Sequence, residues 1–146
     1  MIRKILYAVM VGLVLSTVTA MADDSEKEAA AVSAAEKWLA TVDEGKYAAS
    51  WQDAAELFRN TVEKKKWVQL MKAGRKPLGK LISRKMQSEI YKTSLPGASE
   101  GEYVVIQFAT SFENKKKTIE TVTPMMDKDG RWRVSGYYIN IENEAK

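Results

Sequence analysis

The hydrophobic residues of this chain change their spacing once, at R-K-P-L-G (Arg75 to Gly79). Before this break apolar side chains recur every three or four residues, which is typical of helices that bury one face. After it they recur at every second residue, which is typical of β-strands. The proline and glycine of the break favour a turn between the two patterns. Helices followed by strands predict an α+β fold, with N-terminal helices packed on one face of an antiparallel four-stranded sheet.

Three helical patterns precede the break. A capping box formed by Ser25 and Glu28 predicts the start of the first helix, and Gly45 predicts its end. A second pattern runs from Tyr47 to Phe58, and a third stops near Gly74.

Four strands are expected after the break, each with alternate residues on one face. The residues expected on the helix-facing side are Ile82, Arg84, Met86, Ser88 and Ile90; Val104, Ile106, Phe108, Thr110 and Phe112; Thr118, Glu120, Val122, Pro124 and Met126; and Trp132, Val134, Gly136, Tyr138 and Asn140.

The turn D-K-D-G (Asp127 to Gly130) predicts the pairing of the last two strands. With Gly130 in the left-handed position of a three-residue loop, Met126 lies opposite Trp132. The same register places Glu120 opposite Tyr138. Pro124 cannot donate to a strand ladder, so a bulge or a missing neighbour is expected there.

The N-terminus has the pattern of a secretory signal peptide. Arg3 and Lys4 precede an apolar run from Ile5 to Val18, and Ala20-Met21-Ala22 fits a cleavage site. The predicted organisation is therefore a cleaved leader over residues 1–22 and a single α+β domain over residues 23–146. The expected location is the periplasm, or the medium after full secretion, with no membrane span after processing.

Composition narrows the chemistry. The chain has 23 Lys and Arg, 19 Asp and Glu, no His and no Cys. Removal of residues 1–22 takes away two cations and leaves a net charge of 21 − 19 = +2, which gives no argument for a nucleic-acid partner. Without His or Cys there is no catalytic triad and no thiol nucleophile, and zinc or redox-metal sites lose their usual ligands. No cofactor and no metal site is predicted.

Two charged residues fall on the predicted core face of the strands, Arg84 and Glu120. Burial of an unpaired charge is costly, so we expect the two to pair or to line a pocket, with Tyr138 donating to Glu120. The pair then either fixes the fold or forms the polar floor of a ligand cavity. Trp38, Trp51 and Trp67, at helical spacing, either belong to the core or wall that cavity.

Several stretches resemble a bacterial secreted family called domain of unknown function 4019. They are W-L-x-x-V-D-x-G-x-Y-x-x-S-W (Trp38 to Trp51), R-K-P-L-G, L-P-G-x-x-x-G-x-Y-V-V (Leu95 to Val105), E-T-V-T (Glu120 to Thr123) and D-G-R-W-R-V-S-G-Y-Y-I (Asp129 to Ile139). The resemblance implies an exported domain with no assigned activity or catalytic residues. The layout is also similar to cone-shaped folds related to nuclear transport factor 2, in which helices cover a curved sheet.

Three functions are open at this point. The first is a non-catalytic module of the cell envelope that binds a small molecule or an envelope protein. The second is an enzyme similar to the isomerases and dehydratases on related cones, with Glu120 as its carboxylate. The third is a homodimer through the open sheet face. The apolar residues expected on that face include Tyr103, Val105, Ile119, Tyr137 and Ile139.

Overall fold

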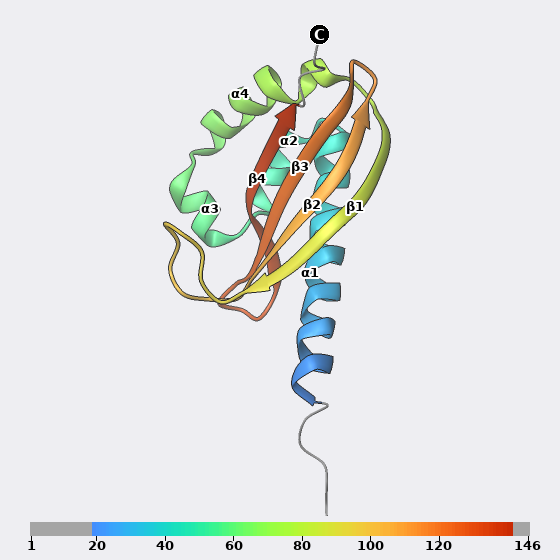
Figure 1. Cartoon of the computed structure of the whole chain (residues 1–146). Helices are drawn as coiled ribbons and strands as arrows, with labels where there is room; N and C mark the ends of the chain where they lie inside the picture. The colour runs from blue at the N-terminus through green and yellow to red at the C-terminus, as the bar shows by residue number, and fades with distance from the viewer. Residues whose placement is uncertain (1–18, 142–146) are drawn as a thin grey trace, which may run out of the picture.

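The computed structural model describes residues 19–141, in which helices precede strands as predicted (Figure 1). The helices are α1 (Thr19–Asp43), α2 (Tyr47–Gln52), α3 (Glu56–Thr61), α4 (Lys64–Gly74) and the 3-10 turn η1 (Lys76–Leu78). The strands are β1 (Leu81–Lys92), β2 (Tyr103–Phe112), β3 (Lys115–Met126) and β4 (Trp132–Ile141).

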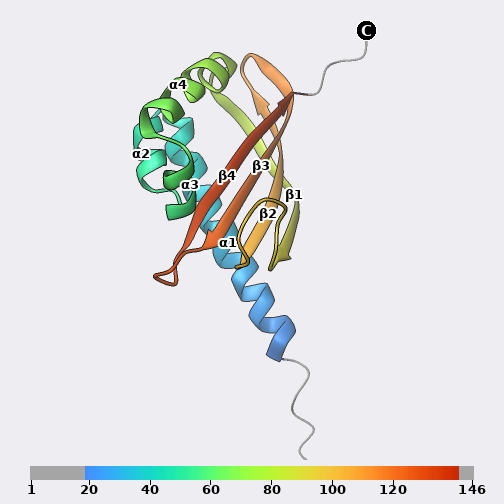
Figure 2. The same cartoon turned by 90° about the vertical axis from the view of Figure 1, so that its left-hand side faces the viewer.

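The four strands form one antiparallel sheet in the order β1-β2-β3-β4. Figure 2 shows the sheet nearly edge-on, with the helices on one side of it. The sheet is curved and does not close, so the predicted α+β arrangement is confirmed. Within the described residues, no helix is both long and apolar enough to cross a bilayer.

The core lies between α1 and the helix-facing side of the sheet. Ala31, Ala35 and Leu39 of α1 are fully buried and belong to the same cluster as the strand residues Val104, Ile106, Phe108, Val122 and Val134. Trp38 and Trp67 are also buried in this cluster, and Trp51 packs against it. Trp38 and Trp67 therefore belong to the core, and Trp51 lies at its edge.

The tryptophans also fasten the helices together through their indole N–H groups. Trp38 donates to the Ser50 carbonyl (2.8 Å), and Trp67 donates to the Ser50 hydroxyl (3.0 Å). Trp51 donates to the carbonyl of Val62 (2.7 Å). A buried indole N–H needs an acceptor, and these three bonds tie α1 and α4 to α2, and α2 to the end of α3.

The boundaries of α1 agree with the sequence at one end only. At its C-terminus the N–H of Gly45 reaches the Val42 carbonyl (2.9 Å), and that of Lys46 reaches the Thr41 carbonyl (3.2 Å). Gly45 has φ +75°, so the predicted glycine stop is confirmed. The start near Ser25 is wrong, because Ser25 lies inside α1, which already includes Thr19, the first described residue; the predicted cleavage site after Ala22 also falls inside the helix. The rest of the predicted leader, residues 1–18, lies outside the described residues.

The second helical pattern is divided into α2 and α3. Ala55 is extended (φ −61°, ψ 151°), and its N–H donates to the Val134 carbonyl of β4 (2.8 Å). The carboxylate of Asp127, in the β3–β4 turn, accepts a bond from the first N–H of α3, that of Glu56 (3.2 Å). The single helix expected over this stretch is interrupted because the sheet binds its backbone.

The β3–β4 hairpin has the predicted turn and the predicted bulge. Gly130 has φ +79°, the N–H of Asp127 bonds the Arg131 carbonyl (2.9 Å), and Met126 lies opposite Trp132. The register then shifts: Pro124 pairs with Val134, but Thr123 pairs with Gly136. Ser135 is therefore an extra residue in β4, and it reverses the faces of every β4 residue after it.

This reversal corrects two predictions. Tyr138 does not share the face of Glu120, which lies opposite Ile139 instead. Tyr137 and Ile139 are consequently on the helix-facing side, so they do not belong to the open face proposed for a dimer. Tyr103 of β2 was likewise proposed for the dimer face. It is buried, and its hydroxyl donates to the Ser99 carbonyl in the β1–β2 loop (2.6 Å).

Strand β1 carries two irregularities of the same kind. Its register shifts between Leu81 and Ser83, and again between Met86 and Ser88. Arg84 and Met86 face the helices opposite Thr110 and Phe108, as predicted. Ser88 and Ile90 do not, because the second shift turns them to the open face.

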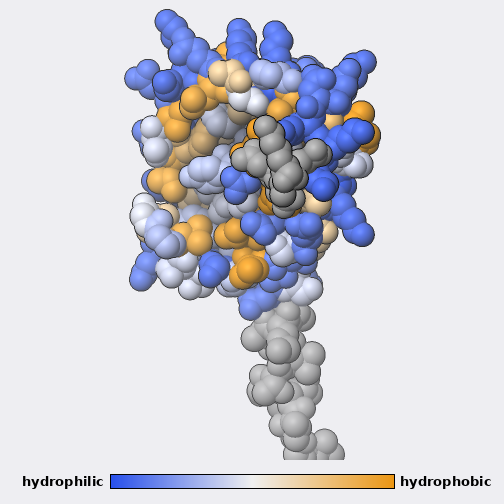
Figure 3. Space-filling model, turned by 45° about the horizontal axis from the view of Figure 1, so that its top comes forward, coloured by the Kyte–Doolittle hydropathy of each residue, from blue (hydrophilic) through white to orange (hydrophobic). Residues whose placement is uncertain are grey.

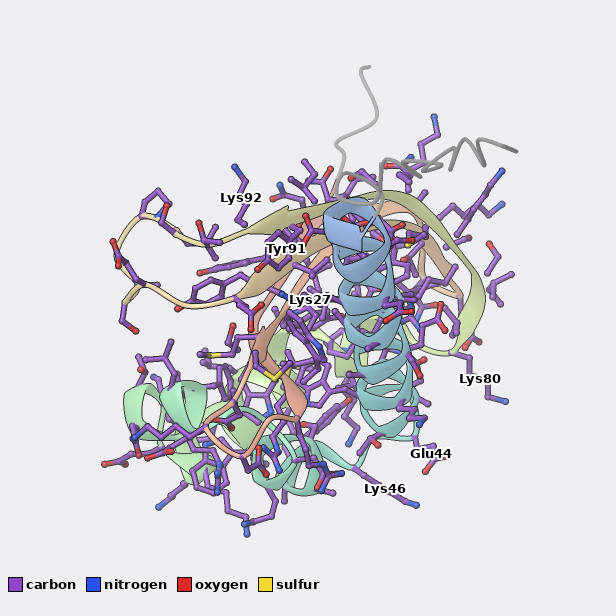
Figure 4. All side chains as sticks on the ribbon, turned by 90° about the horizontal axis from the view of Figure 1, so that it is seen from below. Lys27, Glu44, Lys46, Lys80, Tyr91 and Lys92 are labelled. Carbon is purple, nitrogen blue, oxygen red and sulfur yellow. The ribbon has the colours of Figure 1, made fainter. Side chains whose placement is uncertain are left out.

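The N-terminal part of α1 is held to β1 and β2 by a polar cluster (Figure 4). The Lys27 ammonium lies 2.7 Å from the Glu102 carboxylate and 5.5 Å from the centre of the Tyr91 ring. Tyr91 donates its hydroxyl to the same carboxylate (2.9 Å). The hydrogen bond from Lys27 lowers the pKa of Glu102, which favours the charged form of this tether.

Candidate functional site

Arg84 and Glu120 form the pair that their positions in the strands predict. The Arg84 Nε donates to Glu120 Oε1 (2.7 Å), and Nη2 donates to Oε2 (3.2 Å). Glu120 is fully buried on β3, and the Arg84 side chain is largely buried on β1. The planar guanidinium thus binds the carboxylate through two bonds, which a lysine ammonium cannot reproduce.

A second carboxylate, Asp43, occupies the other edge of the same guanidinium. Arg84 Nη1 donates to Asp43 Oδ2 (2.7 Å), and Nη2 donates to Oδ1 (2.9 Å). Asp43 is the last residue of α1, where a negative charge opposes the helix dipole. An acid in that unfavourable position is the sequence signal for a cationic partner, and the sequence analysis missed it.

Arg75 completes the charge balance. Its Nη2 lies 3.3 Å from Asp43 Oδ1, its Nη1 donates to the Gly79 carbonyl (2.7 Å), and its guanidinium lies 4.3 Å from the centre of the Phe112 ring. Two arginines and two acids therefore alternate as Glu120–Arg84–Asp43–Arg75. We call these four residues the ionic chain; its formal charge is zero, which suits burial between sheet and helices.

Glu120 accepts two further hydrogen bonds from neutral hydroxyls. Thr110 donates to Oε1 (2.6 Å), and Tyr137 donates to Oε2. Thr110 is aligned in turn by Thr118, whose hydroxyl donates to the Thr110 carbonyl (2.7 Å). With the two bonds from Arg84, the carboxylate has four donors, about as many as its lone pairs can serve.

The tyrosine that donates to Glu120 is Tyr137, not the predicted Tyr138. Tyr138 is 73% exposed and lies on the opposite face of the sheet. Tyr137 packs edge-on against Trp38, with ring centres 5.3 Å apart. The bulge at Ser135 explains why Tyr137 takes the place expected for Tyr138. The extra residue shifts the pairing of β4 with β3 by one residue.

The surroundings of the ionic chain shift the pKa values of Arg84 and of Tyr137. Burial acts to lower the pKa of Arg84, but its hydrogen bonds to Asp43 and Glu120 outweigh burial and raise the pKa above its usual range. Burial and the charge of Glu120 raise the pKa of Tyr137 well above its usual value near 10, so this hydroxyl remains a donor.

This arrangement is poorly suited to acid–base chemistry. A general base needs a free lone pair directed at a substrate proton, and the lone pairs of Glu120 are engaged. The described residues contain no group of three or more Asp and Glu side chains placed to hold a metal ion.

Two hollows lie elsewhere on the surface. The apolar groove, about 610 Å³, lies between α3, α4, the β1–β2 loop and β4, and Trp67 and Tyr137 line it. The polar hollow, about 900 Å³, lies between α1, the α2–α3 turn and the β3–β4 hairpin, and Trp38 lines it. Neither hollow includes Arg84, Glu120 or Trp51 among its described lining residues.

Comparison with protein families gives a match over residues 34–137 to the model described as "Protein of unknown function (DUF4019)". The chain belongs to the DUF4019 family. The matched residues include all four members of the ionic chain together with Thr110 and Tyr137. Neither the curated proteins nor the solved structures contain a match to this DUF4019 chain.

The Tyr137 hydroxyl should make this DUF4019 protein less stable as the pH becomes alkaline. Because its pKa is raised in the folded state, the stability that it contributes is present below pH 10 and is lost as the pH rises above 10. Tyr137→Phe should lower the free energy of unfolding by about 1–3 kcal/mol at neutral pH, since it removes a bond to a charged group. It should also flatten the decline in stability above pH 10.

Urea unfolding between neutral pH and alkaline pH measures both effects. Tyr138→Phe is the matched control, because its hydroxyl is exposed and should change neither quantity. A Tyr137→Phe protein with unchanged stability and an unchanged alkaline slope would show that the bond to Glu120 contributes nothing.

Proposed function

We propose that this protein is a non-catalytic binding module of the cell envelope. It is exported with a signal peptide that is cleaved after Ala22. Its apolar groove accepts an extended, apolar segment of an envelope partner protein. The observation that carries this proposal is the gathering of exposed large apolar side chains around that groove.

The composition of the groove supports a macromolecular ligand. Leu57 (37% exposed), Leu70 (49%) and Tyr138 (73%) line it, and large side chains exposed together are typical of interaction sites. Leu95 and Pro96 of the β1–β2 loop add to the same lining. Figure 3 shows hydrophobic residues around a hollow on the side where α3 and α4 lie.

The position of the groove supports an extended ligand. It runs beside β4, which is an edge strand of the sheet. An extended peptide that lies along an edge strand gains main-chain hydrogen bonds, and its alternate side chains enter the neighbouring pockets. The groove thus offers both the apolar contacts and the strand edge that this mode of recognition uses.

The state of Glu120 argues against the isomerase or dehydratase alternative. That reading needs a carboxylate with a free lone pair, and Glu120 is bound to Arg84 at 2.7 Å and to two hydroxyls. We therefore place function at the surface and assign the ionic chain to the fold.

Selection from a displayed library of random peptides tests the groove. We expect enriched peptides with apolar residues at alternate positions, and at least about tenfold weaker binding of these peptides to Leu70→Glu, because a carboxylate placed in an apolar groove loses its hydration. Ile82→Glu is the matched control: Ile82 is 66% exposed but lies on β1, at the other edge of the sheet.

The proposal fails if no peptide is enriched over selection on Leu70→Glu. It fails equally if Ile82→Glu weakens binding as much as Leu70→Glu does, since the retained peptides would then recognise exposed apolar residues in general.

The export part of the proposal has its own test. The intact mass of the protein recovered from the periplasm of an expressing bacterium should correspond to a chain that begins at Asp23. Recovery of the chain with Met1 and the whole leader, in the membrane fraction, would show a retained anchor instead.

A further inference from the structure

The polar hollow differs from the apolar groove in both shape and charge. One wall is the face of α1 that carries Ala30, Ser33 and Ala34, whose small side chains leave the space open. The opposite wall is the β3–β4 hairpin with the α2–α3 turn. Charged side chains dominate the lining, so its ligand is of a different class from that of the groove.

Three of the four acids that line the hollow form ion pairs within the protein. Arg133 binds Asp127 (3.2 Å) and Asp129 (2.7 Å). Lys128 lies 3.6 Å from Glu56. Asp127 is further committed, because it also accepts the first N–H of α3. These three acids share two cations, so one negative charge of the group remains to be set against the other cations of the hollow.

Three cations in the lining have no such partner. Lys37 of α1, Arg59 of α3 and Arg131 of the hairpin form no ion pair with the described residues. Asp53 is the acid of the lining that likewise forms none. Counted over the whole lining, five cations stand against four acids, so the hollow has a net charge of 5 − 4 = +1.

A second observation concerns the side chain of Arg59. Its Nε is buried and has no hydrogen-bond partner among the described residues. A buried donor on a charged group without an acceptor is unfavourable, and the Arg75 Nε of the ionic chain is in the same state. Arg59 lines the hollow, and its guanidinium forms no ion pair with the described residues.

We propose that the polar hollow binds a small organic anion with two oxyanion groups, carboxylate or phosphate. The guanidinium groups of Arg59 and Arg131 have the planar geometry that holds an oxyanion through two bonds, and Lys37 supplies a third positive charge from the facing helix. The site requires neither the apolar groove nor its peptide ligand.

Titration calorimetry at low salt tests the site with two probes, citrate for carboxylate and inorganic pyrophosphate for phosphate. We expect saturable binding of at least one probe with one site per chain, and none of sorbitol, a neutral molecule. The probe that binds more tightly identifies the oxyanion. Arg59→Gln should weaken that binding at least about tenfold.

Two further variants keep the test decisive. Arg131→Gln removes an exposed cation of the same hollow, so it should weaken binding even if Arg59→Gln proves unstable. Lys46→Gln is the control for net charge, because Lys46 is exposed, bound to Glu44 (2.8 Å) and outside the hollow. The site is disproved if neither probe binds at millimolar concentration, or if Lys46→Gln weakens binding as much as Arg131→Gln does.

Discussion

The rest of the structure depends on one guanidinium that joins three elements. Arg84, on the edge strand β1, binds Glu120 on β3 across the width of β2 and binds Asp43 at the end of α1. Two charged residues of the sheet, Arg84 and Glu120, lie on its core side, where apolar side chains would be simpler to accommodate. A buried ion pair of this kind adds little net stability over an apolar substitute, but removal of one partner is costly because the other charge remains buried. The pair therefore specifies which strand and which helix end meet.

That constraint also determines where function can reside. The buried carboxylate has no lone pair left for a substrate, and its partners are tied to the backbone or to each other. The three tryptophans hold the helices together through their indole bonds, and Trp38 and Trp67 also line the polar hollow and the apolar groove. We propose that recognition takes place at the polar hollow and at the apolar groove. One is apolar and the other is rich in unpaired cations, so the two surfaces suit different classes of ligand.

Much of this could be predicted from the sequence, because the signals are local. The change of period at Arg75 to Gly79 predicts the order of helices and strands, and the buried positions of Arg84 and Glu120 follow from alternation. The sequence could not decide whether Tyr137 or Tyr138 faces Glu120. One extra residue at a bulge reverses the faces of the strand that follows, and Pro124 indicates only that a bulge is near. Asp43 and Arg75 were missed because their partners are far away in the chain and alternation says nothing about a helix end. The two hollows arise from packing between elements, which no local pattern describes.

The most direct test of the central claim is the free energy of unfolding of Glu120→Gln, measured beside Arg84→Met and the double variant. Glutamine keeps the shape of Glu120 and removes its charge. If Glu120 neutralises Arg84 in the folded protein, Glu120→Gln lowers the free energy of unfolding by about 3 kcal/mol. The double variant then loses less than the sum of the single losses, by at least about 1 kcal/mol. Unchanged or higher stability of Glu120→Gln, with additive effects in the double variant, would contradict the account and return Glu120 to the candidates for a functional residue.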